Sequence, residues 1–144
     1  MAKIIKSVHI KSDPHKVIDY ISDVQHHPAF ISALKWVDNL SGDPKSNKTS
    51  WDWSFVMSGV ELRGKAETVV YEAGKIYSFK TSGTNSTFIY RVEPEDDGTL
   101  LTIEVEYELP ESVLSKIADK AVVEHLNEEE ANRAAENLKA ILEG

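Results

Sequence analysis

The sequence has 144 residues, of which 41% are hydrophobic and 28% are charged, as is usual for one globular domain. A formal net charge of −8 argues against binding to nucleic acid or anionic membranes, since both need clustered Lys and Arg. The absence of cysteine excludes disulfides, thiolate nucleophiles and Cys-ligated metals. No apolar run is long enough to span a membrane, and residues 1–6 do not resemble a signal peptide. We therefore expect a cytoplasmic protein with no membrane insertion.

The first part of the chain is expected to form one strand and two short helices. Alternating apolar and polar residues predict a strand over 4–10. Asp13 followed by Pro14 is typical of a helix start, because Asp caps free N–H groups and Pro fits the first helical position. A second short helix is predicted over 28–34.

The middle of the chain is predicted to form six strands, because apolar and polar residues alternate between short turns. Short turns join antiparallel neighbours, so these strands should form an antiparallel sheet with one buried side and one solvent-facing side. The expected strands cover residues 34–40, 49–57, 60–71, 75–81, 87–93 and 100–109.

One long helix is predicted to follow the strands. Residues 111–142 contain no Gly or Pro and are rich in Ala, Leu, Glu and Lys. A sheet of six to seven strands twists and must bury its apolar side, and this helix is the one predicted element large enough to cover it. The sequence therefore predicts an α+β fold, with a curved sheet wrapped around the long C-terminal helix, as a single domain over 1–144.

Three segments carry a resemblance to a known superfamily: residues 8–24, residues 102–109 and residues 136–139. With this order of elements, the chain resembles the START-like superfamily, also called Bet v 1-like or SRPBCC, and within it the polyketide cyclase/dehydrase-like proteins. The resemblance implies a helix-grip fold with a ligand cavity between sheet and helix. Members include lipid carriers, metabolite binders, aromatase/cyclases and co-chaperone-like proteins, so the resemblance does not choose among functions.

Large aromatic rings gather on the predicted inner side of the sheet. Gly64 and Ala66 lie among them and leave gaps of the kind that a ligand pocket needs, while Tyr and Trp bring polar groups that can orient a ligand. Plain core packing is the alternative for each ring. The predicted cavity-lining residues of the sheet are Trp51, Trp53, Phe55, Ala66, Tyr77, Phe79, Phe88, Tyr90 and Tyr107.

The apolar stripe of the long helix shifts near its middle. At about 100° per residue, a first stripe runs from Leu114 to His125, and a second one, about a quarter turn away, begins at Ala131. A polar residue that faces the core must be hydrogen-bonded or meet water. His125 and Glu128 are therefore the predicted polar residues of the cavity. The alternative is a bend that leaves both in solvent.

Four polar residues near the short helices invite a metal interpretation: His15, Asp23, His26 and His27. Adjacent histidines point in different directions and no further ligand has motif spacing, so a solvated loop is favoured. We expect no metal and no other cofactor. In the resembling family these helices close one end of the cavity, which makes Phe30 and Trp36 the predicted gate residues.

Three functional hypotheses follow from these patterns. The first is the binding or carriage of a small hydrophobic or aromatic molecule, such as a lipid or polyketide-like metabolite. The second is a cyclase or dehydratase acting on such a compound, with cavity tyrosines and His125 as acid and base candidates. No HExxH, P-loop or dinucleotide motif is present, and catalytic residues stay unassigned. The third is a co-chaperone-like interaction domain. A monomer or weak homodimer is expected.

Overall fold

The structure, a computed structural model, describes residues 2–43, 48–57, 59–83, 85–108 and 120–144. The helical segments in these ranges are α1 (Pro14–Ser22), the 3-10 turn η1 (Val24–His26), α2 (His27–Phe30) and α4 (Lys120–Glu143). The strands are β1 (Ala2–Ile10), β2 (Leu34–Ser41), β3 (Ser50–Met57), β4 (Val60–Glu72), β5 (Ile76–Thr81), β6 (Thr87–Glu95) and β7 (Gly98–Tyr107).

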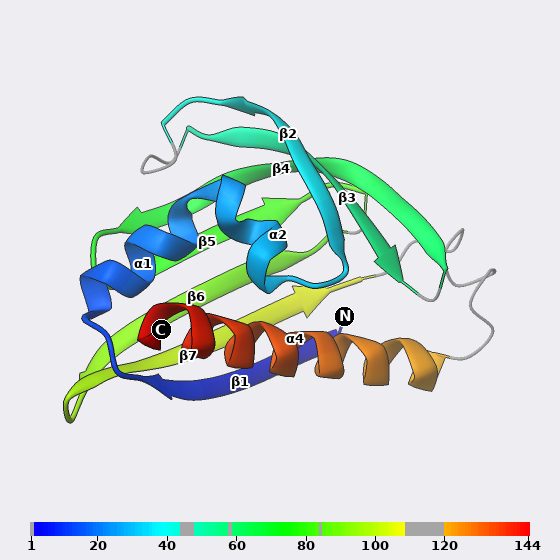
Figure 1. The fold of residues 1–144 in the computed structure, drawn as a ribbon. Helices are drawn as coiled ribbons and strands as arrows, with labels where there is room; N and C mark the ends of the chain where they lie inside the picture. The colour runs from blue at the N-terminus through cyan, green and yellow to red at the C-terminus, as the bar shows by residue number, and fades with distance from the viewer. Residues whose placement is uncertain (1, 44–47, 58, 84, 109–119) are drawn as a thin grey trace.

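The described strands form one antiparallel sheet in the order β1-β7-β6-β5-β4-β3-β2. Strands β2 to β6 each pair with the next strand in the sequence, whereas β1 pairs with β7, so β1 and β2 are the two edges. The sheet curves over α4, which runs beside β1, and α1 and α2 lie on the same concave side (Figure 1). The predicted α+β helix-grip architecture is confirmed.

Two predicted helices differ from the structure or extend beyond its described part. The second short helix spans His27–Phe30 instead of 28–34, because the backbone at Ile31 is already extended, with φ −100° and ψ 95°. Helix α4 is described from Lys120 onward. The side chains of 114–122, which make up most of the first predicted stripe, lie outside the described part of the chain.

Helix α1 begins where the sequence predicts it. The carboxylate of Asp13 accepts a hydrogen bond from the N–H of His15 at 2.8 Å, and Pro14 occupies the first helical turn. Val17 and Ile18 are fully buried beneath the sheet. Helix α1 thereby fixes the direction in which the chain enters η1 and α2.

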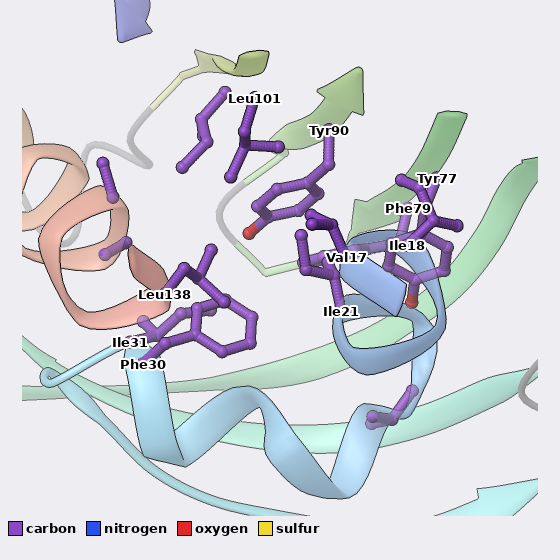
Figure 2. Packing of buried hydrophobic residues seen from close by; sticks show 14 of the residues in the cluster. Val17, Ile18, Ile21, Phe30, Ile31, Tyr77, Phe79, Tyr90, Leu101 and Leu138 are labelled. Carbon is purple, nitrogen blue, oxygen red and sulfur yellow. The ribbon is translucent and has the colours of Figure 1, made fainter. Parts of the chain in front are cut away.

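The hydrophobic core joins the helices to the sheet. Figure 2 shows Ile21 of α1, Phe30 of α2, Tyr90 of β6 and Leu138 of α4 in one cluster. Burying an aliphatic or aromatic side chain of this size contributes about 2 kcal/mol. The core therefore holds α4 and α2 together against the concave side of the sheet.

Polar contacts also fix α4 in place. The side-chain amide of Asn137 donates to the carbonyl of Phe30 at 3.2 Å, and the ammonium of Lys139 donates to the carbonyl of His9 at 2.7 Å. These bonds tie the C-terminal half of α4 to α2 and to β1. Neither α4 nor any other described helix is long and apolar enough to cross a membrane.

Candidate ligand pocket

A pocket of about 110 Å³ lies between the concave side of the sheet and α4. It is much larger than a single-water site and close to the roughly 150 Å³ of an engineered apolar cavity that holds benzene. Its described lining comes mainly from rings on β3, β5 and β6, aliphatic residues of β7, and the small residues Ala131 and Ala134 of α4.

Aromatic rings form the sheet side of the pocket. The rings of Phe79 and Phe88 stack with their centroids 4.7 Å apart, and Trp51 meets Phe79 edge-on at 5.3 Å. Phe79 and Phe88 are direct partners across β5 and β6, which places both rings on the same side of the sheet. Each such ring pair adds about 1 kcal/mol beyond simple burial. This wall is therefore closely packed and apolar.

Trp53 closes the β3 side of the pocket and depends on a glycine in the next strand. Gly64 is its direct partner on β4, and a Cβ at this position would lie 2.7 Å from the indole and 2.0 Å from the carbonyl oxygen of Ser82. The indole N–H donates to the carbonyl of Lys65 at 3.1 Å. The gap that Gly64 leaves is therefore filled by the ring of Trp53 and is not ligand space.

His27, the first residue of α2, contributes a buried imidazole to the pocket. The residue is 1% exposed, and its Nε2 atom lies 2.8 Å from the carbonyl oxygen of Ile21. Its ring centroid lies 5.2 Å from Phe79, 5.6 Å from Phe30 and 5.7 Å from Trp51. An apolar shell of this kind disfavours the charged form of the ring.

The protonation state of His27 follows from this environment. Burial lowers its pKa from 6.5 to about 4, against weaker opposing effects of the Ile21 carbonyl and Asp23. A carbonyl oxygen can only accept, so Nε2 carries the proton and Nδ1 holds a lone pair. Nδ1 has no hydrogen-bond partner among the described residues. At neutral pH the ring is therefore uncharged, and its Nδ1 atom is a hydrogen-bond acceptor without a donor among the described residues.

Tyr90 of β6 brings a second polar group to the pocket. It is 1% exposed, and burial raises the pKa of its hydroxyl well above the usual range. In the described part of the chain this hydroxyl finds no hydrogen-bond partner. Figure 2 shows it directed away from Tyr77, toward the side where α4 carries Leu138. Tyr90 and His27 both pack against Phe79, and both line the pocket.

The polar side chains that α4 brings to the pocket already have partners. Burial raises the pKa of the Tyr107 hydroxyl, and the side chain of Asn127 hydrogen-bonds to that hydroxyl. The carboxylate of Glu130 accepts from the N–H of Ala33 and from the hydroxyl of Ser32, both at 2.8 Å. Helix α4 thus holds the end of β7 and the connection between α2 and β2.

A more polar hollow adjoins the pocket beside the α2–β2 connection. The two spaces share Phe55, Asn127 and Glu130 as lining residues. On the outer side of the hollow, the guanidinium of Arg133 donates to the carboxylate of Glu130 at 3.0 Å. The shared residues therefore form the boundary between the pocket and this hollow.

Most of the sheet residues predicted to line a cavity do line this pocket: Trp51, Trp53, Phe55, Phe79, Phe88, Tyr90 and Tyr107. Ala66 and Tyr77 are buried but lie outside the lining. The Tyr77 ring lies 6.1 Å from that of His27 and 6.2 Å from that of Tyr90, so it supports the pocket from behind. Contact between any of these residues and a ligand stays a prediction.

The two helix residues predicted to face the cavity, His125 and Glu128, do not line the pocket. Both are exposed; the His125 side chain is 69% exposed and lies 3.0 Å from the carboxylate of Glu129. Helix α4 presents Asn127 and Ala131 to the pocket instead, which turns the intervening residues toward solvent. The placement of His125 and Glu128 in the cavity is therefore wrong.

Neither predicted gate residue lies at the boundary of the pocket. Phe30 is fully buried in the core and outside the lining. Trp36 is the cross-strand partner of Ser54, on the outer side of the sheet, with the guanidinium of Arg63 lying 5.9 Å from its ring. A register shift in β2 between Leu34 and Trp36 turns the indole away from the concave side. The gate assignment does not fit these positions.

The interpretation of His27 as part of a solvated loop is also wrong, because its ring lies in the core. A signal was present in the sequence. The buried residues Ile21, Val24, His27 and Phe30 recur at every third position, which carries the apolar stripe of α1 through η1 into α2. Within the described ranges, no group of three or more His, Asp or Glu side chains is arranged to hold a metal ion.

Asn127 and Glu130 were further lining residues that the sequence could have indicated. Asn127 lies four residues before Ala131, and Glu130 lies four residues before Ala134, so both share the face of the second apolar stripe. Extending that stripe backward identifies them, whereas extending the first stripe forward leads to residues on the exposed side of the helix.

Solved structures share this fold at low sequence identity. A START superfamily protein from Mycobacterium smegmatis is 14% identical with a TM-score of 0.79, over 98% of this chain and 97% of that one. The Zhui aromatase/cyclase from a Streptomyces species is 10% identical with a TM-score of 0.76, over 99% and 93%. A major latex-like protein from Panax ginseng is 20% identical with a TM-score of 0.70, over 98% and 97%. The protein therefore has the fold of START-like domains.

The family is established by sequence. The model of the family described as polyketide cyclase / dehydrase and lipid transport matches residues 1–143, and the chain belongs to that family. A search of curated proteins finds no match. Since the fold serves several activities, the function has to be argued from the pocket.

Proposed function

We propose that the protein binds or carries a small apolar or aromatic molecule in this pocket. The observation that supports the proposal most is a cavity of about 110 Å³ with a wall of aromatic rings and few polar groups. The pocket is much larger than a single-water site, which favours a ligand site over plain packing. The family description, which includes lipid transport, agrees with this role.

The volume favours a ligand about the size of one aromatic ring, by comparison with the benzene-sized cavity of roughly 150 Å³. A lipid chain or a polyketide with several rings would need a wider space. The α2–β2 connection would then have to move away from α4, against the hydrogen bonds that Glu130 makes to Ser32 and Ala33. The adjoining polar hollow, with Phe55 and Asn127 at its boundary, is the proposed entrance.

Filling the pocket from α4 tests this function. The variant Ala131→Leu places a larger side chain inside the pocket, and Ala140→Leu places the same side chain on the exposed side of the helix. We expect toluene and indole to raise the Tm of the wild type and of Ala140→Leu, because a ligand stabilises the state that it binds. Ala131→Leu should lose this response.

Native mass spectrometry of freshly purified wild-type protein supplies an independent check, since a carrier is expected to retain a small molecule that denaturation releases. The proposal is abandoned if no single-ring compound shifts the Tm and no bound mass is present.

No specific observation favours the other two functions. The cyclase or dehydratase alternative named His125 and the cavity tyrosines as acid and base candidates. His125 is exposed together with Glu128, and burial raises the pKa of Tyr90 and Tyr107, which line the pocket, so neither is readily deprotonated as a base. The interaction alternative requires a large exposed apolar patch. The exposed large hydrophobic residues described lie on four separate elements: Ile5, Trp36, Val69 and Ile141.

A further inference from the structure

We propose that the pocket selects a neutral ring compound that carries a hydroxyl group, and that His27 is the residue that recognises this hydroxyl. The inference rests on the proposed function and deepens it by naming the ligand chemistry. It begins from His27, a buried residue that lines the pocket and whose Nδ1 atom makes no hydrogen bond among the described residues.

The acceptor character of Nδ1 is set by the protein. The Ile21 carbonyl accepts the proton of Nε2 at 2.8 Å, which leaves the lone pair on the other ring nitrogen. A buried acceptor with no donor is costly, and a ligand that supplies a donor removes that cost. A purely apolar ligand of the same shape leaves the acceptor unpaired and excludes the water that could have served it.

Tyr90 supplies the complementary group. A ligand hydroxyl that donates to His27 still has two lone pairs, and the hydroxyl of Tyr90 can donate to one of them. The rings of His27 and Tyr90 lie 5.2 and 6.3 Å from that of Phe79, and both residues line the pocket. The pair therefore fits a hydroxyl group better than an ether or a methyl group.

The charge of the pocket excludes an acid as the favoured ligand. The described lining contains no Lys or Arg, and its single carboxylate, Glu130, would repel an anion. A carboxylate in this apolar space would lose its hydration without gaining a counter-ion. A phenol stays neutral at physiological pH, offers one donor and places a flat ring against the aromatic wall. The geometry thus points to a phenol-like group on the ligand.

The test uses two probes of nearly identical shape, p-cresol and p-xylene, which differ by a hydroxyl in place of a methyl group. Dissociation constants are measured by protein-observed NMR titration for the wild type and for His27→Phe. We expect the preference for p-cresol over p-xylene to be at least about tenfold greater in the wild type than in the variant. The matched control is His26→Phe, because His26 stacks on Tyr20 outside the pocket lining and should keep the wild-type ratio.

A second measurement needs no variant, which matters if His27→Phe does not fold. The nitrogen-15 resonance of His27 Nδ1 in the wild type should move toward that of a hydrogen-bonded nitrogen on addition of p-cresol, and should not do so with p-xylene. The anion p-toluate should bind more weakly than either probe. The variant Tyr90→Phe removes only the hydroxyl that would donate to the ligand, so it should weaken p-cresol binding and leave p-xylene binding unchanged.

The outcomes separate this inference from the function on which it rests. If p-xylene binds, but the ratio is the same in the wild type and in His27→Phe, or p-cresol leaves Nδ1 unshifted, the hydroxyl recognition is refuted while the pocket remains a binding site. If neither probe binds the wild type, the hydroxyl recognition is refuted, and the proposed function is refuted with it when no other single-ring compound shifts the Tm and no bound mass is present.

Discussion

Among the histidines of this chain, His27 is the one enclosed by other aromatic rings, and its burial has a consequence for stability at acid pH. Its pKa in the folded state is about 4, below the ordinary value of 6.5. Between these two values the folded protein binds fewer protons than the unfolded chain. The free energy of unfolding therefore falls as the pH is lowered from 6.5 to 4.

This effect should amount to about 3 kcal/mol for a shift of this size. Urea unfolding of the wild type at a series of pH values should show the loss, and His27→Phe should lack this part of it. Two neighbours act on the pKa of the His27 ring in opposite directions, Asp23 favouring its charged form and His26 disfavouring it. The variant His15→Gln is the matched control, because it removes an exposed imidazole and leaves the buried ring of His27 in place.

The positions of the three tryptophans allow fluorescence to distinguish ligand binding in the pocket from changes elsewhere in the molecule. Trp51 and Trp53 line the pocket, whereas Trp36 lies on the outer side of the sheet. Toluene binding should change the tryptophan emission of the wild type and of Trp36→Phe alike, and should change that of Trp51→Phe less. An equal loss of the response in Trp36→Phe would contradict the placement of these rings.

At the level of elements, one carboxylate controls how α4 meets the α2–β2 connection. Glu130 accepts hydrogen bonds from Ser32 and Ala33 and also contacts Arg133. Charge-assisted bonds of this kind are stronger than those between neutral groups. The connection should therefore open more easily when the charge of Glu130 is removed.

The variant Glu130→Gln keeps the size of the side chain and removes its charge. We expect a loss of about 1–2 kcal/mol in the free energy of unfolding and faster ligand dissociation, because the proposed entrance opens more often. Urea unfolding and stopped-flow dissociation measure the two effects. Glu128→Gln is the matched control on the same helix, since Glu128 is exposed and outside the lining. Equal behaviour of the two variants would exclude a role for Glu130 in closure.

The order of the elements could be predicted from the sequence, because strand alternation and helix starts are local signals. Pairing of Phe79 with Phe88, for example, follows from two alternating strands joined by a short turn. In the middle of α4, the side facing the sheet could be assigned by extending either of two apolar stripes. The structure supports the stripe that includes Asn127 and Ala131. That choice depends on tertiary packing, which no local pattern contains.

Individual site residues were harder to predict, because tertiary packing can bury a residue whose type favours the surface. His27 is polar and follows another histidine, both of which favour a surface loop, yet it lies within an apolar stripe of period three. The register shift before Trp36 reverses the side of the sheet to which alternation assigns its ring. Such a register shift cannot be recognised from the composition or the spacing of residues in the sequence.

For the molecule as a whole, the sheet is stabilised by different contacts from those that hold α2 and α4, the helical cover on its concave side. Strands β6 and β7 are joined by a continuous ladder, whereas α4 is held to α2 and to the α2–β2 connection through side chains, Asn137 and Glu130 respectively. Local opening usually begins where fewer bonds must break. The helical cover should therefore open while the sheet stays intact.

Hydrogen exchange tests this division. Amides of α2 and of the described part of α4 should exchange faster than those of β6 and β7, and p-cresol should slow exchange in both helices together. Ligand protection confined to the sheet would show that the entrance lies elsewhere.

The contact between Trp53 and Gly64 also bears on how this protein could diverge from its relatives. The indole occupies the space above the glycine, with 2.7 Å to the position of a Cβ at residue 64. A smaller residue in place of Trp53 would add volume to the cavity without altering the course of either strand. Position 64 does not offer the same freedom, because a Cβ there would lie 2.0 Å from the backbone carbonyl oxygen of Ser82 and would displace the strands themselves. Ligand size could therefore evolve through single substitutions at Trp53, as long as Gly64 keeps the two strands in place.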